Sequence, residues 1–169
     1  MLFTAGLLLL ATGAAASCPN GIPAAEAAAI LAVHNKLRAS ISAGTYVAKG
    51  RKMPAAKTKL PSLTWDCGIE ASAQKVATTC VFAHSQGRKN LGENLYYYQS
   101  TKDDFGWGST KMTSALFNTG VGHATQMAWA SSTKIGCGMA LCKGNKQVIV
   151  ACQYRDAGNM IGSDIYTPK

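Results

Sequence analysis

The sequence predicts an α+β fold in which helices cover a β-sheet. Segments 24–43 and 67–80 repeat apolar residues with a helical period, whereas two β-rich runs lie near the end of the chain. These runs flank residues 143–146, "KGNK", which is a hairpin signal. Because helices come first and strands follow, the helices are expected to pack against the sheet.

The first helix is predicted over Ala24–Ala43. It begins behind Pro23 and ends at Gly44, residues typical of these two helix boundaries. Apolar residues recur along it at steps of three and four, on the face that also carries His34. We therefore expect His34 to be a hydrogen-bonded histidine of the core.

The second helix is predicted over Cys67–Cys80, with Asp66 as its N-cap. A third, short helix or turn is predicted over Thr110–Phe117. The segment Gly122–Ala130 fits a helix and a strand equally well, so its local structure stays open.

The hairpin near the end of the chain has a predictable register. If Gly144 and Asn145 form a two-residue loop, counting outward from it places Cys137 directly opposite Cys152. Opposed residues of paired strands come close enough to form a disulfide. The register thus predicts the pair Cys137–Cys152.

Three consecutive tyrosines, Tyr96, Tyr97 and Tyr98, invite a ligand-stacking interpretation. In a strand, Tyr96 and Tyr98 would project from one face and Tyr97 from the other. Two of the three are therefore expected to pack in the core or at its rim.

The first residues are typical of a signal peptide. An apolar run from Leu7 to Leu10 is followed by three alanines before Ser17, and the run is too short to span a bilayer. We predict a signal peptide over residues 1–16 and a single domain over residues 17–169. No later segment is long and apolar enough to cross a membrane, so the chain is expected to be secreted and extracellular, not transmembrane.

Six cysteines follow the predicted signal peptide: Cys18, Cys67, Cys80, Cys137, Cys142 and Cys152. An even number in a secreted chain predicts three disulfides, for which fifteen pairings are possible. No Cys-x-x-Cys pair occurs, which argues against a metal site made of these cysteines.

The chain is basic, with 17 Lys and Arg against 8 Asp and Glu and a net charge of +9. Its densest basic segment, Ala48–Leu60, lacks the aromatic residues that stack on bases, so nucleic acid is not an expected partner. This segment is either a solvated loop or a surface that attracts anionic partners such as sulfated glycans or lipid headgroups.

Candidate chemistry lies in three titratable residues, His84, Glu93 and His123. Two imidazoles and a carboxylate are the ligand types of a zinc site with an open position, and they also suit general acid–base catalysis. Ser85 could complete a Ser-His-Glu set, although sequence neighbours rarely point at each other. No G-x-S-x-G motif is present.

Several motifs resemble the CAP superfamily, which comprises cysteine-rich secretory, antigen 5 and pathogenesis-related class 1 proteins. "GHATQMAWASSTKIGCG" and "VACQYRDAGNMIG" are similar to its two signatures, and "HNKLR", "FAHS" and "GENLYYY" match other landmarks in the right order. The resemblance extends over Cys18–Ile165. It is most like the venom-allergen-like, or activation-associated, secreted proteins of parasitic nematodes.

The resemblance implies an α-β-α sandwich, in which a three-stranded antiparallel sheet lies between helical layers. It also implies the disulfides Cys18–Cys67, Cys80–Cys142 and Cys137–Cys152. The family's central cleft is lined by two histidines and two glutamates and holds Zn or another divalent cation in several members. His84, His123 and Glu93 match three of these four positions and are the implied metal ligands.

The chain departs from the family at the second glutamate. Counting back from Asp104–Trp107 places that position near Thr101, and the helix that should carry it is shortened or missing near Gln99–Phe105. Ala124 also replaces an aromatic residue. We therefore expect any bound cation to be held weakly, and we expect less sterol binding, because the family associates that activity with the shortened loop.

The function implied by the resemblance is a secreted, non-enzymatic protein that modulates host immunity by binding a host protein or lipid. Two alternatives remain. One is a metal-dependent hydrolase that uses His84, Glu93 and His123, and the other is a module that binds anionic glycans or membrane surfaces through its basic segment.

Overall fold

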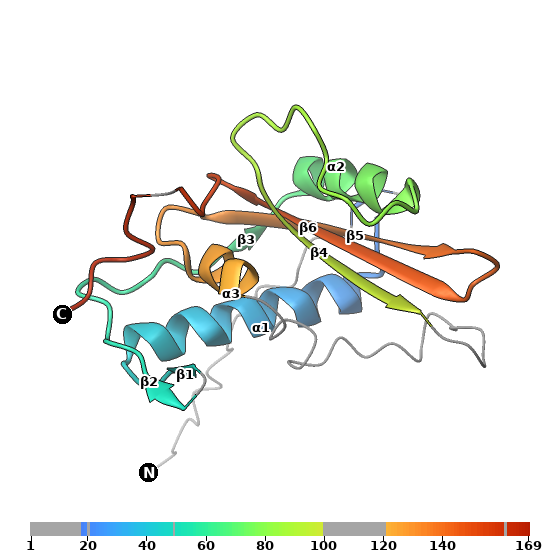
Figure 1. Cartoon of the computed structure of the whole chain (residues 1–169). Coiled ribbons are helices and arrows are strands. Elements are labelled where there is room, and N and C mark those ends of the chain that lie inside the picture. The colour runs from blue at the N-terminus through green and yellow to red at the C-terminus, as the bar shows by residue number, and fades with distance from the viewer. Residues whose placement is uncertain (1–17, 20, 49, 100–120, 161) are drawn as a thin grey trace, which may run out of the picture.

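The computed structural model describes residues 18–19, 21–48, 50–99, 121–160 and 162–169. This part of the chain folds into three layers, with α2 on one side of a sheet and α1 and α3 on the other (Figure 1). The elements are α1 (Ala24–Ser42), β1 (Val47–Ala48), β2 (Arg51–Lys52), β3 (Thr64–Trp65), α2 (Cys67–Thr78), β4 (Gly92–Gln99), α3 (Val121–Ala128), β5 (Lys134–Cys142) and β6 (Gln147–Arg155). The predicted α+β class and layered arrangement are confirmed.

The sheet has the order β3-β5-β6-β4. Its three long strands are antiparallel, as predicted, while the two-residue strand β3 adds a parallel fourth member beside β5. A run of two residues is too short to show a strand periodicity in the sequence. The same holds for the β1–β2 pair, which begins at Val47 and overlaps the start of the basic segment.

The register predicted for the β5–β6 hairpin is confirmed. Cys137 pairs with Cys152 and forms a disulfide with it. The turn covers residues 143–146 rather than two residues, and Lys143, Gly144 and Asn145 all have a left-handed backbone, with φ of 49°, 63° and 63°. The loop geometry therefore places every residue of β5 opposite its partner in β6.

Alternation along the strands divides the core into two halves. Ile135, Val150 and Tyr154 face α1, whereas Ala140 and Ile149 face α2. The tyrosine run obeys the same rule, because Tyr96 packs on the first half and Tyr97 on the second. Both are half-buried, as expected for residues at the rim of a core.

Two glycines of β5 let α2 lie directly on the sheet. A Cβ at Gly136 would come within 2.2 Å of the Glu70 amide nitrogen, and one at Gly138 would meet the Gln74 Cα at 2.2 Å. At this close approach the Gln74 side chain exchanges two hydrogen bonds of 2.9 Å with the backbone of Met139. Gln74 thereby satisfies part of the edge of β5 that β3 is too short to cover.

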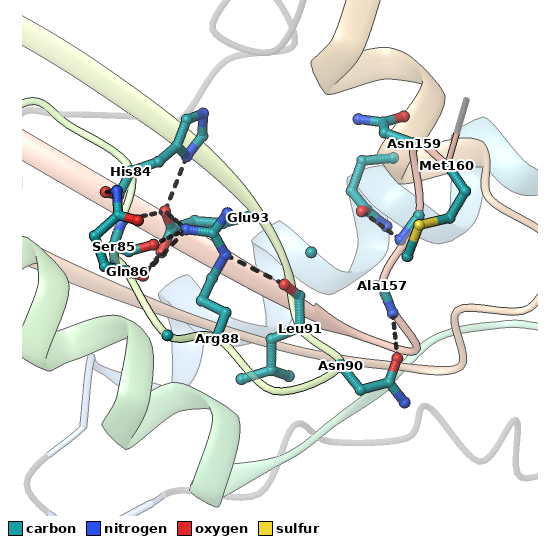
Figure 2. A pocket seen from close by; sticks show the side chains of 14 residues that line it. His84, Ser85, Gln86, Arg88, Asn90, Leu91, Glu93, Ala157, Asn159 and Met160 are labelled. Carbon is teal, nitrogen blue, oxygen red and sulfur yellow. Dashed lines mark hydrogen bonds and ion pairs between the residues drawn. The ribbon is translucent and has the colours of Figure 1, made fainter.

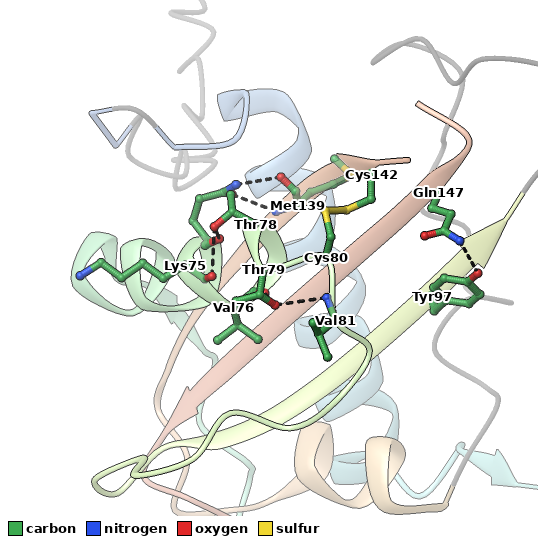
Figure 3. Close-up of a disulfide and its surroundings, with 11 residues drawn as sticks. Lys75, Val76, Thr78, Thr79, Cys80, Val81, Tyr97, Met139, Cys142 and Gln147 are labelled. Atoms are coloured by element: carbon green, nitrogen blue, oxygen red, sulfur yellow. Dashed lines mark hydrogen bonds between the residues drawn. A yellow bond between two sulfur atoms is a disulfide. The ribbon is translucent and has the colours of Figure 1, made fainter. Parts of the chain in front are cut away.

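All three implied disulfides are present, and two of them tie α2 to other parts of the chain. Cys18–Cys67 ties the N-terminal segment to the start of α2, where Asp66 accepts a hydrogen bond from the Ile69 amide as the predicted N-cap. Cys80–Cys142 joins the chain after α2 to the end of β5 (Figure 3). The second helix therefore has both of its ends bound covalently to other elements.

Some predictions lie outside the described residues, namely the signal peptide over 1–16, the helix over Thr110–Phe117 and, apart from Gln99, the shortened segment near Gln99–Phe105. The segment left open, Gly122–Ala130, is helical over most of its length and forms α3. Within the described residues, no helix is both long and apolar enough to cross a membrane.

Arg38 is a buried arginine on α1 that bonds five backbone carbonyls. Its Nε donates to Pro61 O at 2.7 Å, Nη1 to Met127 O at 3.0 Å and Trp129 O at 2.9 Å, and Nη2 to Ala130 O at 3.4 Å and Ser132 O at 3.0 Å. All five guanidinium N–H groups are therefore used. Burial lowers the pKa of Arg38 to about 10, so it stays charged at neutral pH.

We predict that Arg38→Met lowers the free energy of unfolding by about 3–5 kcal/mol, because it leaves five carbonyls without their donor. Arg38→Lys should lower it less, since an ammonium group can still serve up to three of them. Urea unfolding measures both values. The matched control is Lys36→Met on the exposed face of the same helix, with an expected change within about 0.5 kcal/mol. Equal effects at positions 36 and 38 would contradict the role of Arg38.

Candidate functional site

Two neighbouring residues of β4, Glu93 and Asn94, face opposite sides of the sheet. Glu93 accepts a hydrogen bond from Gln153, and Asn94 donates one to Tyr154. Gln153 and Tyr154 are themselves neighbours on β6, so both pairs follow from the strand alternation. Glu93 bonds to the side chain of His84, and Asn94 bonds to the backbone carbonyl of His123 in α3.

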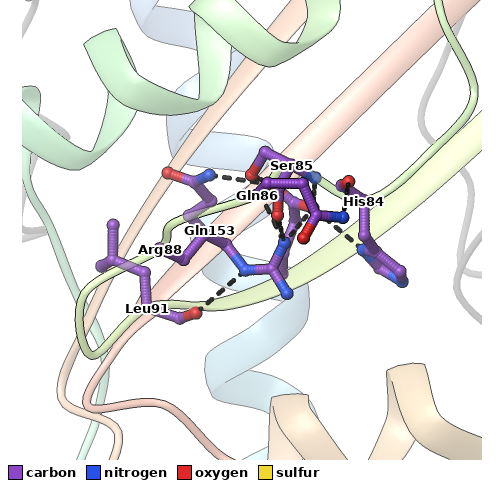
Figure 4. Close-up of polar contacts among 7 residues, drawn as sticks. His84, Ser85, Gln86, Arg88, Leu91 and Gln153 are labelled. Carbon is purple, nitrogen blue, oxygen red and sulfur yellow. Dashed lines mark hydrogen bonds and ion pairs between the residues drawn. The ribbon is translucent and has the colours of Figure 1, made fainter.

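Glu93 is a buried carboxylate that accepts five hydrogen bonds (Figure 4). Oε1 accepts from His84 Nδ1 at 2.9 Å, from the Ser85 amide at 2.9 Å and from Arg88 Nη1 at 3.1 Å. Oε2 accepts from Ser85 Oγ at 2.7 Å and from Gln153 Nε2 at 2.9 Å. Both carboxylate oxygens are thus engaged by the protein itself.

The ionised form of Glu93 is favoured in the folded protein. Burial tends to raise the pKa of Glu93, but hydrogen bonds from Gln153, Ser85 and His84 outweigh it and bring the pKa below its ordinary value. The stability that these bonds supply is present at neutral pH and is lost as the pH falls through the lowered pKa. The carboxylate therefore holds the 84–88 segment in place as an anion.

His84 is oriented by this carboxylate. Its side chain is 55% exposed, whereas that of Glu93 is 0% exposed. Because an ionised carboxylate can only accept, Nδ1 of His84 carries the proton of their hydrogen bond. In the neutral ring, the lone pair is then on Nε2, the nitrogen that does not bond Glu93.

Asn94 connects α3 to a buried network on the opposite face. Its Nδ2 donates to the His123 carbonyl and to Tyr154 Oη, each at 3.1 Å. Nδ1 of His34 must donate to the Ile30 carbonyl, at 2.8 Å, so Nε2 of the neutral ring accepts the proton of Tyr154 Oη, also at 2.8 Å. His34 is the hydrogen-bonded core histidine that its position on the first helix predicted.

His123 lies in the first turn of α3 and is half-buried. Burial lowers its pKa, and the nearby His84 lowers it further. Both effects favour the neutral imidazole, the form that binds metal ions. The two histidines are 39 positions apart in the sequence, and within the described residues the ligand atoms of His84, Glu93 and His123 do not all lie within 4.8 Å of one another.

Other contacts hold the far end of α3. Gln126 donates to Ser132 Oγ at 3.1 Å and accepts from the Gly158 amide at 2.9 Å, and Arg38 binds the carbonyls that follow. A helix of eight residues is too short to be stable alone. The position of His123 therefore depends on these contacts at both ends of the helix.

A pocket of about 540 Å³ lies beside His84 and Glu93. It extends from the 84–92 segment to residues 157–160, and Gln126 also lines it (Figure 2). Asn159 and Met160 lie across the pocket from the His84 ring. His84 and Glu93 line this pocket, whereas His123 is not among the lining residues.

The structure argues against two other arrangements of chemical groups. Ser85 Oγ donates to Glu93 rather than to His84, so these residues do not have the order of a Ser-His-Glu triad. Within the described residues, one group of three possible metal ligands has its atoms within 4.8 Å of one another, Cys18, Cys67 and Glu70. Its sulfur atoms form a disulfide, which removes the thiolates that a metal would need.

The basic segment Ala48–Leu60 remains a candidate surface. Lys52, Lys57 and Lys59 are exposed, as either of its two interpretations requires. Its backbone is tied to the C-terminal residues by a bridge between Ala56 and Pro168. The charged side chains thus project from an anchored segment.

Sequence reasoning identified both histidines and Glu93, but it missed Asn94, Gln153, Arg88 and Arg38. One available signal was the alternation of Glu93 and Asn94 along a predicted strand. Another was Arg38, which falls on the same face of the first helix as His34 and Ile41 and is buried with them. A charged residue among core positions indicates a buried polar network.

Comparison with known proteins identifies a family. Residues 31–154 match the cysteine-rich secretory protein family, CAP. The Ancylostoma secreted protein of Ancylostoma caninum is 36% identical over 177 residues, which covers 89% of this chain and 41% of the relative. Venom allergen 3 of Solenopsis invicta is 34% identical, with 88% of this chain and 75% of the relative covered. The chain thus spans less than half of the Ancylostoma relative.

Solved structures show the same fold. The structure of BmVAL-1 has a TM-score of 0.78 and 32% sequence identity, covering 91% of this chain and 88% of that one. The crystal structure of NaASP2 with Zn²⁺ has a TM-score of 0.75 and 34% identity, covering 90% and 91%. The relatives bear the names of secreted and venom proteins, which implies an extracellular location.

We predict that the protein loses stability as the pH falls from about 6.5 to about 4, with His34 as a main cause. Burial lowers the pKa of His34 from 6.5 to about 4, so the unfolded chain takes up its proton first. The part of this loss that is due to His34 should reach about 3 kcal/mol and level off below pH 4, where the lowered pKa of Glu93 causes a further loss. Urea unfolding across this range measures it.

The variant His34→Gln isolates this contribution, because His123 also titrates in the same direction. The variant should be less stable at pH 7 but should lose less stability on acidification than the wild type. Parallel pH curves for the two proteins would rule out His34 as the cause.

Proposed function

The chain belongs to the cysteine-rich secretory protein (CAP) family, and on that premise we propose that it is a secreted, non-enzymatic protein. It binds a divalent cation between His84 and His123 and acts on a host protein or lipid to modulate the host's immune response. The named secreted and venom proteins among its relatives support the extracellular role. The observation that carries the proposal is the Glu93 carboxylate, whose hydrogen bonds prepare His84 as a ligand.

A cation would be held by Nε2 of His84 and by the imidazole of His123. Glu93 orients His84 instead of binding the metal itself, because both its oxygens already accept hydrogen bonds. A carboxylate behind a ligating imidazole fixes the ring and strengthens it as a ligand. The lowered pKa of His123 keeps the second imidazole available at neutral pH.

Two protein ligands make a weak site. Catalytic zinc sites have three protein ligands and a water molecule, and structural sites have four. The position of the family's second glutamate lies near Thr101, outside the described residues. The cation, when bound, would polarise the groups that complete its coordination shell, and these come from water or from a partner.

The geometry around Ser85 supports a binding role over hydrolysis. A serine nucleophile needs its hydroxyl proton directed to a base, whereas Ser85 directs it to the carboxylate that also orients His84. The pocket beside the site is lined mainly by polar residues, which favours a protein or other polar partner over a lipid tail.

We predict that Zn²⁺ raises the melting temperature of the untagged protein, because the folded state binds it. His84→Ala and His123→Ala should abolish the shift. Glu93→Gln should weaken Zn²⁺ binding about 10–100-fold while leaving both imidazoles in the protein. Calorimetric titration of the metal-free protein measures the affinities.

The control is Gln86→Ala, an exposed residue beside His84 that contributes no imidazole or carboxylate. Zn²⁺ binding that survives in both histidine variants would contradict the proposed site. With Zn²⁺ present, the wild type and His123→Ala should show the same background rate against ester and peptide substrates. A rate that falls only in the variant would instead identify a hydrolase.

A further inference from the structure

The pocket beside His84 is large enough for a ligand of its own. We propose that it binds a sugar-sized polar molecule carrying an anionic oxyacid group (sulfate, phosphate or carboxylate), with Arg88 as the anchor. This proposal goes beyond the cation site and does not depend on it. The chemical class of this ligand follows from the residues that line the pocket, from the hydrogen-bond donors that have no partner in the protein, and from the charge of the pocket wall.

Hydrogen bonds within the protein connect the segments that line the pocket. Asn90 donates to the Asp156 carboxylate and accepts from the Ala157 amide, and Gln126 accepts from the Gly158 amide. These bonds connect the 84–92 segment and α3 to residues 156–158. A volume of about 540 Å³ lies within the range of ~300–1,000 Å³ that is usual for small-ligand sites. The pocket is therefore preformed and sized for a small molecule.

The lining is mainly polar. Apart from glycines, its apolar members are Leu91, Ala157 and Met160, against eight polar or charged residues. Small-ligand pockets are usually lined predominantly by hydrophobic and aromatic side chains with a few polar groups, so this pocket is more polar than most. A ligand that fits here must carry hydrogen-bonding groups over most of its surface.

Most of these polar groups are already used within the protein, but His84 keeps Nε2 as an acceptor and Arg88 keeps one terminal nitrogen as a donor. Nε of Arg88 donates to the Leu91 carbonyl at 3.3 Å, and its Nη1 to Glu93 at 3.1 Å and to the Ser85 carbonyl. These bonds hold the guanidinium plane in a fixed position. Among the described residues Nη2 has no hydrogen-bond partner, so one edge of the fixed guanidinium is available to a ligand.

The charge at the pocket wall favours an anion. Arg88 has a side chain that is 28% exposed, while Glu93, which balances it, is 0% exposed. A ligand therefore meets the guanidinium rather than the carboxylate. The next residue, Lys89, is exposed, and the chain as a whole carries +9. A fixed guanidinium is well suited to the planar or tetrahedral oxygens of an oxyacid.

The test uses N-acetylglucosamine 6-sulfate, its 6-phosphate counterpart, glucuronic acid and uncharged N-acetylglucosamine, titrated into metal-free protein in chelator. We expect the charged sugars to bind and the uncharged one to bind at least tenfold more weakly. Arg88→Gln should weaken binding about tenfold or more. Lys89→Gln, which removes the same charge one residue away but does not line the pocket, should change it less than twofold.

A second pair of variants avoids the bonds of Arg88 to its neighbours. Met160 lines the pocket and is 52% exposed, so it can be replaced without disturbing the core. Met160→Glu should repel the charged sugars, whereas Met160→Gln should not. The proposal fails if none of the charged sugars binds, if the uncharged sugar binds equally well, or if Lys89→Gln and Arg88→Gln have the same effect. Because chelator is present throughout, failure here leaves the cation site untouched.

Discussion

The buried guanidinium of Arg38 fixes the relative position of the elements that build the site. A charge in the core is tolerated only when its hydrogen bonds are complete, and Arg38 completes them with five backbone carbonyls. Four of these carbonyls belong to residues 127–132, at and beyond the end of α3. The α1 helix thus holds the end of a helix too short to be stable alone, and that helix carries His123.

The two ends of the site are joined through one strand. Because β4 is the edge strand of the sheet and alternates between faces, Glu93 orients His84 from one face, and Asn94 holds the His123 carbonyl from the other. The two histidines come from segments far apart in the sequence, but they are held by two consecutive residues of β4, Glu93 and Asn94. A register slip of β4 by one residue would turn Glu93 and Asn94 to the opposite faces of the sheet, and both contacts would be lost.

The elements with strong local signals could be predicted from the sequence, and those that depend on distant contacts could not. Helical period and capping placed α1 and α2, and the Gly144-Asn145 loop determined the strand register and one disulfide. In contrast, β3 has two residues and no period, and it pairs with a strand 70 positions away. The segment that forms α3 was ambiguous because its stability comes from Arg38 and Asn94 rather than from its own sequence. For the same reason, Glu93 was identified as a member of the site, whereas its hydrogen bonds to Ser85, Arg88 and Gln153 were not.

Glu93 sets the tautomer of His84 and leaves Nε2 as the free ligand nitrogen. The most direct measurement is the ¹⁵N chemical shifts of the His84 ring in the metal-free protein at neutral pH or slightly above, recorded by long-range proton–nitrogen correlation. We expect a ring protonated at Nδ1 with an unprotonated Nε2, and a shift toward a mixture of tautomers in Glu93→Gln. A wild-type ring protonated at Nε2 instead would contradict this role of Glu93.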